Sequence, residues 1–154
     1  MRSRPPAATA NSPDEVEAAF YEALQRGDIE ALMAVWADDD EVVCVHPGGG
    51  RVVGLGAIRS SFESIFNNGG GIAVQVDQVH RLQVLNSALH HLVEKVKVAG
   101  ADGHKHVAWV IASNHYVKTE AGWRLACHHA SPGSLQPQTA GTAAAASDRA
   151  NRLH

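Results

Sequence analysis

The chain has 154 residues, of which 45% are hydrophobic and 19% charged, so one domain with a packed core is expected. The net charge is −3, but without the ends (1–13 and 132–154) the middle holds 9 basic and 15 acidic residues, a net of −6. An acidic domain repels nucleic-acid backbones, and no apolar run reaches the length of a membrane span. We therefore expect neither a nucleic-acid nor a membrane partner.

The two ends differ in composition from the middle. Residues 1–13 are rich in Pro, Ala and Arg, and 132–154 in Ala, Thr, Gln and Ser, so neither offsets its ordering entropy by burying apolar surface. We expect disordered tails there, around a folded domain at 14–131. Cys44 and Cys127 are too few for a disulfide framework, and no apolar leader is visible, so we expect free thiols in a cytoplasmic protein.

The first half of the domain predicts three helices and one short strand. Apolar residues recur at helical spacing over 14–26, where Ser12 is the expected N-cap, and again over 28–36 and 55–67. A short apolar strand at 42–45 separates the last two helices. The run His-Pro-Gly-Gly-Gly after it lacks the Lys-Ser/Thr of a phosphate-binding loop, so we interpret it as a turn.

From residue 72 the hydrophobic period changes to two. This predicts four strands, at about 72–84, 88–98, 105–118 and 122–131, joined by short turns as antiparallel hairpins. Helices that do not alternate with strands must cover one face of the sheet. The expected fold class is α+β: a cone-shaped, curved antiparallel sheet with three N-terminal helices packed on its concave face.

Four segments together resemble a known family: residues 20–32 (FYEALQRGDIEAL), 36–39 (WADD), 53–58 (VGLGAI) and 122–131 (GWRLACHHAS). In order and spacing they are similar to SnoaL-like and ketosteroid isomerase-like proteins of the nuclear transport factor 2 (NTF2)-like superfamily. The resemblance implies the cone fold and a homodimer formed through the outer sheet face. It also implies isomerase, dehydratase or cyclase chemistry, or a pocket with no reaction.

The resemblance can be carried to individual positions. His46 stands where ketosteroid isomerases have an aspartate base, and Asn114 where they have a protonated aspartic acid. Phe20 stands where they have a tyrosine, with Tyr21 one step off the expected helix face. All three positions depart from the family pattern, so we do not expect a typical steroid isomerase.

Strand alternation indicates which polar side chains face inward. Lys95 and Lys97 belong on the outer face, which turns Glu94 inward, where burial would raise its pKa. In the last strand, alternation from the apolar Trp123 and Leu125 predicts that His129 faces inward and His128 outward. The orientation of Asn114 follows from the resemblance alone. The outer face then carries apolar side chains suited to a homodimer interface: Val93, Trp109 and Ile111.

These placements define the candidate site. The expected catalytic residues are His46, Glu94, His129 and Asn114, lining one cavity, and the expected ligand-pocket residues are Phe20, Trp36, Phe62 and Tyr116. An imidazole can act as a base, a carboxylate can fix its tautomer, and an amide can donate to an oxyanion. The alternative is that each polar group is a hydrogen-bonded part of the core.

Ten histidines raise the question of a metal site. His104 and His106 share one strand face, but no spacing matches a zinc motif, so we expect no metal and no cofactor. Two hypotheses for the function remain. The first is a cofactor-independent acid/base enzyme acting on a small apolar or aromatic molecule. The second is a non-catalytic ligand-binding or dimeric interaction module.

Overall fold

The structure is a computed structural model that describes residues 10–133. Its helices are α1 (Pro13–Arg26), α2 (Ile29–Ala34) and α3 (Leu55–Gly69). Its strands are β1 (Val43–Val45), β2 (Arg51–Val53), β3 (Val74–Val84), β4 (Ser87–Ala99), β5 (Lys105–Thr119) and β6 (Gly122–Pro132). Every element expected from periodicity is present with ends within about two residues. Most of both predicted tails lies outside the described residues.

Helix α1 begins and ends as the sequence predicts. The Ser12 side chain accepts a hydrogen bond from the Glu15 backbone N–H, and Pro13 occupies the first turn. Gly27 closes the helix with φ at 65°. A Cβ at Gly27 would also lie 3.0 Å from the backbone nitrogen of Gly71, so both conformation and space require glycine there.

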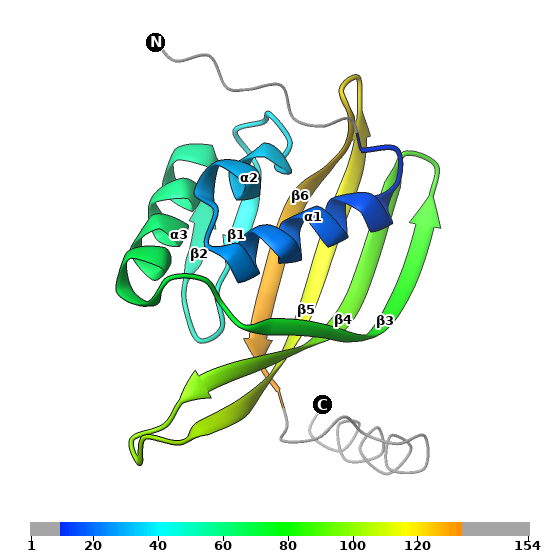
Figure 1. Ribbon diagram of the computed structural model, residues 1–154. Coiled ribbons are helices and arrows are strands. Elements are labelled where there is room, and N and C mark those ends of the chain that lie inside the picture. The colour runs from blue at the N-terminus through cyan, green and yellow to red at the C-terminus, as the bar shows by residue number, and fades with distance from the viewer. Residues whose placement is uncertain (1–9, 134–154) are drawn as a thin grey trace.

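The sheet has six strands in the order β2-β1-β6-β5-β4-β3. Strands β3 to β6 pair antiparallel in sequence order, as predicted, and all three helices lie on one face of the curved sheet (Figure 1). The expectation of a wholly antiparallel sheet is wrong in one detail, because β1 pairs parallel with β6. Strand β2 was not expected, since three residues are too few to show an alternating pattern.

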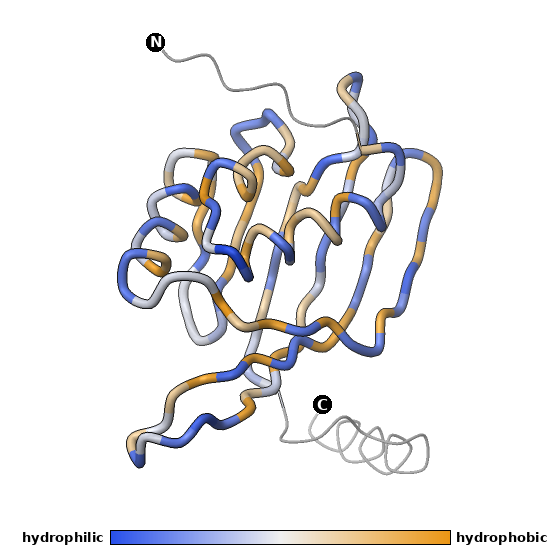
Figure 2. The backbone as a smooth tube through the Cα atoms, in the orientation of Figure 1, coloured by the Kyte–Doolittle hydropathy of each residue, from blue (hydrophilic) through white to orange (hydrophobic). Residues whose placement is uncertain are grey.

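The core lies between the helices and the inner, concave face of the sheet. Phe20, Trp36, Phe62 and Tyr116 are all at most 2% exposed, and the Phe20 ring meets Trp36 and Phe62 edge to face. Along β4 and β5, hydrophobic and hydrophilic residues are interspersed (Figure 2). Both cysteines are free thiols. Within residues 10–133, no helix is long and apolar enough to cross a membrane.

A β-bulge in β6 reverses the faces expected for its second half. His115 pairs with Cys127 and the next residue, Tyr116, with Leu125, so Ala126 has no partner on β5. An extra residue in one strand shifts the alternation by one. Beyond the bulge, His128 is buried on the inner face and His129 is exposed on the outer face. The orientations predicted for these two histidines are therefore wrong.

Candidate functional site

Four buried polar side chains from four elements form a connected network on the inner face. They are Tyr21 on α1, Glu94 on β4, Asn114 on β5 and His128 on β6. Asn114 and His128 are directly paired residues of neighbouring strands, so they share a face by register. Helix α1 crosses this face and brings Tyr21 to Glu94, 73 positions away in the chain (Figure 1).

The hydrogen bonds of the network have a single direction. The Tyr21 hydroxyl donates to Glu94 Oε2 over 2.7 Å, and Asn114 Nδ2 donates to the Tyr21 oxygen over 2.9 Å. Asn114 Oδ1 is then the acceptor facing His128 Nδ1 at 2.5 Å, so Nδ1 carries the proton. The amide thus fixes the imidazole tautomer and leaves Nε2 of His128 unprotonated.

Burial sets the protonation of Glu94. Desolvation raises the pKa of Glu94 to about 7, and the hydrogen bond from Tyr21 opposes that rise. The pKa of Tyr21 is raised by burial and by the negative charge of Glu94, so the phenol remains protonated. Glu94 is therefore a carboxyl that changes charge near neutral pH, with a fixed donor on one oxygen.

His128 is held neutral beside this carboxyl. Burial lowers the pKa of His128 to about 3, with smaller contributions from His46 and His129. Its Nε2 lies 3.9 Å from Glu94 Oε2. This distance is too long for a direct hydrogen bond, but one atom of a bound molecule could bridge the two groups. A proton acceptor and a titrating carboxyl thus face one another across a short gap.

The network is almost completely shielded from solvent. The side chains of Glu94 and His128 keep 8% and 5% of their surface, whereas Asn114, Tyr116 and Phe20 keep none. A side chain that lined a water-sized opening would retain accessible surface. The predicted pocket residues therefore form packed core in this structure, and within the network a small exposed fraction remains at Glu94, Tyr21 and His128.

His46 lies near this network but is separated from it by aromatic rings. It follows β1, and its ring meets Phe62 edge to face at 4.8 Å. The Ser61 hydroxyl donates to the Ile58 carbonyl, so His46 Nε2 must donate to the Ser61 oxygen over 2.9 Å. His46 is half-buried, and burial lowers its pKa. It is thus a neutral imidazole with Nδ1 as the acceptor.

The predicted catalytic set is only partly assembled. Glu94 and Asn114 meet through Tyr21, while His46 stands behind Phe62 and His129 lies on the opposite face. The sequence analysis missed the part that Tyr21 plays because α1 buries two successive positions, Phe20 and Tyr21. It missed His128 because the bulge at Ala126 has no glycine or other sequence signature.

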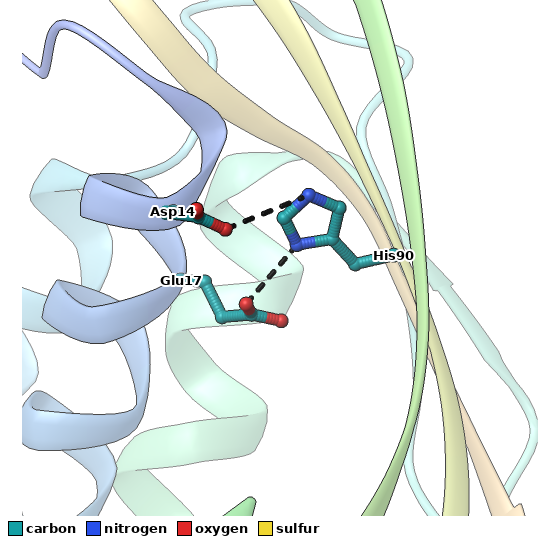
Figure 3. A group of neighbouring side chains, drawn as sticks. All are labelled: Asp14, Glu17 and His90. Carbon is teal, nitrogen blue, oxygen red and sulfur yellow. Dashed lines mark hydrogen bonds and ion pairs between the residues drawn. The ribbon is translucent and has the colours of Figure 1, made fainter. Parts of the chain in front are cut away.

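A second cluster, in which Glu17 and His90 are buried and Asp14 is exposed, joins the N-terminal turn of α1 to the sheet (Figure 3). His90 Nδ1 lies 3.0 Å from Glu17 Oε2, and its Nε2 lies 4.0 Å from Asp14 Oδ1. These three residues offer ligand atoms within 4.8 Å of one another, a donor set that a divalent cation could use. However, Arg81 already donates to Asp14 over 2.8 Å and offsets the charge of that carboxylate.

Tyr116 lies between the two clusters. Its ring packs edge to face on His90 at 4.9 Å, and burial followed by the charge of Glu17 raises its pKa. An interaction with the Asn114 side chain opposes this rise of the pKa. Neither this hydroxyl nor Glu17 Oε1 makes a hydrogen bond of ordinary geometry with the described residues. The inner face therefore carries one well-bonded network and one loosely bonded neighbour.

Comparison with known proteins agrees with this architecture. A family model described as a SnoaL-like domain matches residues 14–134. A protein from Streptomyces avermitilis, named as a dehydratase of the NTF2-like family, is 32% identical to this chain in sequence. The match covers 77% of this chain and 91% of that chain, at a TM-score of 0.69. The chain belongs to the SnoaL-like family of the NTF2-like superfamily. A search of curated proteins finds no match.

Other similar structures have different names. A proposed calcium/calmodulin-dependent protein kinase type II association domain from Thiobacillus denitrificans is 31% identical, covering 82% of this chain and 99% of that chain, at a TM-score of 0.74. A ketosteroid isomerase-like protein from Erwinia carotovora atroseptica is 22% identical, covering 79% and 93%, at a TM-score of 0.64. The fold is thus shared by proteins named for catalysis and for association.

Proposed function

We propose that this domain binds a small, apolar or aromatic molecule beside Glu94 and acts as a cofactor-independent acid/base catalyst of the isomerase, dehydratase or cyclase type. The observation that carries the proposal is Glu94, a carboxyl 6% exposed whose pKa is raised to about 7. Groups that titrate near neutrality in a buried setting are characteristic of acid/base sites. The relative named as a dehydratase supports the same class.

In this proposal each neighbour of Glu94 has a role. Glu94 exchanges a proton with the bound molecule, and Nε2 of His128 accepts a hydrogen bond from it across the 3.9 Å gap. Tyr21 and Asn114 hold both groups in place through their chain of hydrogen bonds. His46, half-buried and neutral, is a second base closer to the solvent. His129 has no part, because it lies on the outer face.

The second candidate is a non-catalytic module that associates as a homodimer through the outer sheet face. The packed aromatic residues of the inner face support it, since they leave no opening at the positions predicted to line a pocket. Exposed apolar side chains on the outer face support it too, with Val107 at 46% and Ile111 at 38%. The two candidates are compatible, because they use opposite faces of one sheet.

Two probes separate catalysis from binding. The first, 2-naphthol, is flat and apolar with one hydroxyl, and its fluorescence reports binding. The second, 2-cyclohexenone in D₂O, reports proton exchange by NMR, because a base that removes an α-proton leaves an enolate that takes a deuteron back. Wild type should bind the naphthol and accelerate exchange, and Glu94→Gln should lower the exchange rate at least about tenfold. The rate should rise with pH through about 7.

The matched control is Asp77→Asn, which removes an outer-face carboxylate and should leave both readouts unchanged. Saturable binding with exchange equal in wild type and Glu94→Gln would reject catalysis on this probe and favour the binding module. The absence of both binding and exchange would count against the inner-face site itself. For the dimer, Ile111→Arg should yield a monomeric mass in light scattering, while Asn86→Arg at a turn should not.

A further inference from the structure

The ring of His90 lies between two carboxylates of α1 (Figure 3). Its Nδ1 lies 3.0 Å from Glu17 Oε2, and its Nε2 lies 4.0 Å from Asp14 Oδ1. Asp14 and Glu17 are three positions apart, so they share the side of the helix that faces β4. A neutral imidazole carries one proton, so one of its two nitrogens must face a carboxylate as an acceptor. A positive charge between the ring and α1 therefore stabilises this arrangement.

The buried part of the cluster contains polar atoms without partners. The Glu17 side chain is 9% exposed, and its Oε1 makes no hydrogen bond with the described residues. The Tyr116 hydroxyl is buried and lacks such a bond too, and its ring packs on His90 at 4.9 Å. Burying a carboxylate oxygen without a donor costs free energy, and buried charges are ordinarily paired or bound to metals. The unpaired oxygen of Glu17 thus points to a positively charged ligand, independently of how the three side chains are spaced.

The exposed part of the cluster is able to accept an ion. Arg81 donates to Asp14 over 2.8 Å, but the two side chains are 50% and 62% exposed, and such pairs contribute little to stability. A cation can therefore replace Arg81 at Asp14. The ligand atoms of the three residues lie within 4.8 Å of one another, whereas bonds of about 2.0–2.2 Å to tetrahedral zinc place ligand atoms about 3.4 Å apart. Rotation of the exposed Asp14 side chain closes this difference.

We propose that Asp14, Glu17 and His90 bind a divalent transition-metal ion of the Zn²⁺ type, which ties α1 to β4. Imidazole together with carboxylates suits zinc and its neighbours, whereas Mg²⁺ and Ca²⁺ prefer oxygen ligands alone. Glu17 and His90 are 73 positions apart, so they fall outside any short zinc motif. Glu17 lies four positions before Tyr21, so the ion also fixes the turn of α1 that donates to Glu94. The metal site stands whether or not Glu94 is catalytic.

The test is a Co²⁺ titration of the untagged full chain at pH 7.5, after treatment with EDTA. Tetrahedral Co²⁺ absorbs visible light, so it reports both binding and geometry, and Zn²⁺ should displace it. Wild type should hold one tightly bound Co²⁺ per chain. It should unfold at a higher temperature with Zn²⁺, because an ion that binds the folded state stabilises it. Mg²⁺ at an about hundredfold higher concentration should not displace Co²⁺.

Three variants test the ligands one at a time. Glu17→Gln, His90→Gln and Asp14→Asn should each raise the dissociation constant for Co²⁺ at least about tenfold. Asp14 is exposed, so Asp14→Asn keeps the test decisive even if a variant of a buried ligand fails to fold. Near-ultraviolet circular dichroism checks that every sample is folded.

The matched control is His106→Asn. His106 Nε2 lies 3.1 Å from Asp102 Oδ1 in an exposed pair, so it offers an imidazole and a carboxylate without burial. This variant should keep the wild-type dissociation constant. Absence of Co²⁺ binding by wild type would overturn the site and leave a proton on His90 as the positive charge of the cluster. Wild-type affinity in Asp14→Asn, or in a folded variant of Glu17 or His90, would overturn it as well, because the ion would then lie elsewhere.

Discussion

His128 and His129 are neighbours in the chain, but their side chains lie on opposite faces of the sheet. The two faces differ in how far they bury an imidazole. His128 is 4% exposed, bonded to Asn114 and held neutral by burial, which lowers its pKa to about 3. His129 is exposed to solvent and in register with Ser113. The same side chain is thus a buried, hydrogen-bonded acceptor on the inner face and a solvated group on the outer face.

The difference shows that a shifted pKa here comes from burial rather than from residue type. The inner face has removed water from Glu94, Tyr21 and His128, and each of these groups favours its neutral form. The outer face keeps water around its charged groups, so ion pairs such as Lys95–Asp77 contribute little to stability. Substitutions of matched residues on the two faces should therefore respond to pH differently.

The largest effect should come from Glu94→Gln against its outer-face counterpart Asp77→Asn. The folded pKa of Glu94, about 7, lies above its ordinary 4.5, so the folded state binds more protons between these values and wild-type stability falls as pH rises through them. The gain from Glu94→Gln should therefore be about 3 kcal/mol larger at pH 8 than at pH 4. Urea denaturation at both pH values measures it.

Asp77→Asn should change stability by no more than about 1 kcal/mol at either pH, because its pair with Lys95 is partly exposed. If Glu94→Gln gives the same stability change at pH 4 and pH 8, Glu94 titrates normally and the acid/base role assigned to it fails.

A smaller effect should separate His128→Asn from His129→Asn. The folded pKa of His128, about 3, lies below its ordinary 6.5, so the unfolded chain binds the extra proton and wild type loses stability as pH falls from 6.5 toward 3. Between pH 7.5 and pH 5, wild type should lose about 2 kcal/mol more than His128→Asn. Chemical denaturation at the two pH values is the measurement.

His129→Asn is the matched control and should follow the wild-type folding stability across that range when both are compared as monomers at low concentration. Equal acid sensitivity of wild type and His128→Asn would mean that His128 is not buried as described. A large effect of His129→Asn on folding stability would mean that His129 is buried, and that the bulge in β6 lies at another residue.

The smallest effect should distinguish two buried phenols of the inner face. Tyr21→Phe removes a donor to Glu94 and an acceptor for Asn114, and should cost about 1–2 kcal/mol. Tyr116→Phe removes a hydroxyl without an ordinary hydrogen bond to the described residues, and should be nearly neutral. Thermal unfolding at pH 7 compares them. A greater loss for Tyr116→Phe would show that the connection through Glu17 dominates the inner face.

Local sequence determined most of the architecture. Ser12 and Gly27 set the ends of α1, and the change of hydrophobic period near residue 72 predicted the four long strands. Alternation within β4 was enough to turn Glu94 inward, because two lysines cannot be buried without partners. These features depend on interactions between residues close in the chain, so a single sequence contains them.

Tertiary structure decided the pairing of β1 with β6, the extra residue at Ala126 and the contact of Tyr21 with Glu94. None of these has a local cause. A bulge is fixed by the register of two strands, and a parallel pair joins segments 84 positions apart, Val43 and Cys127. The sequence therefore predicted the fold and two members of the network, Glu94 and Asn114. The prediction chose His129 as the inward histidine, whereas the structure has His128. The difference comes from the register of β5 and β6, which tertiary packing determines.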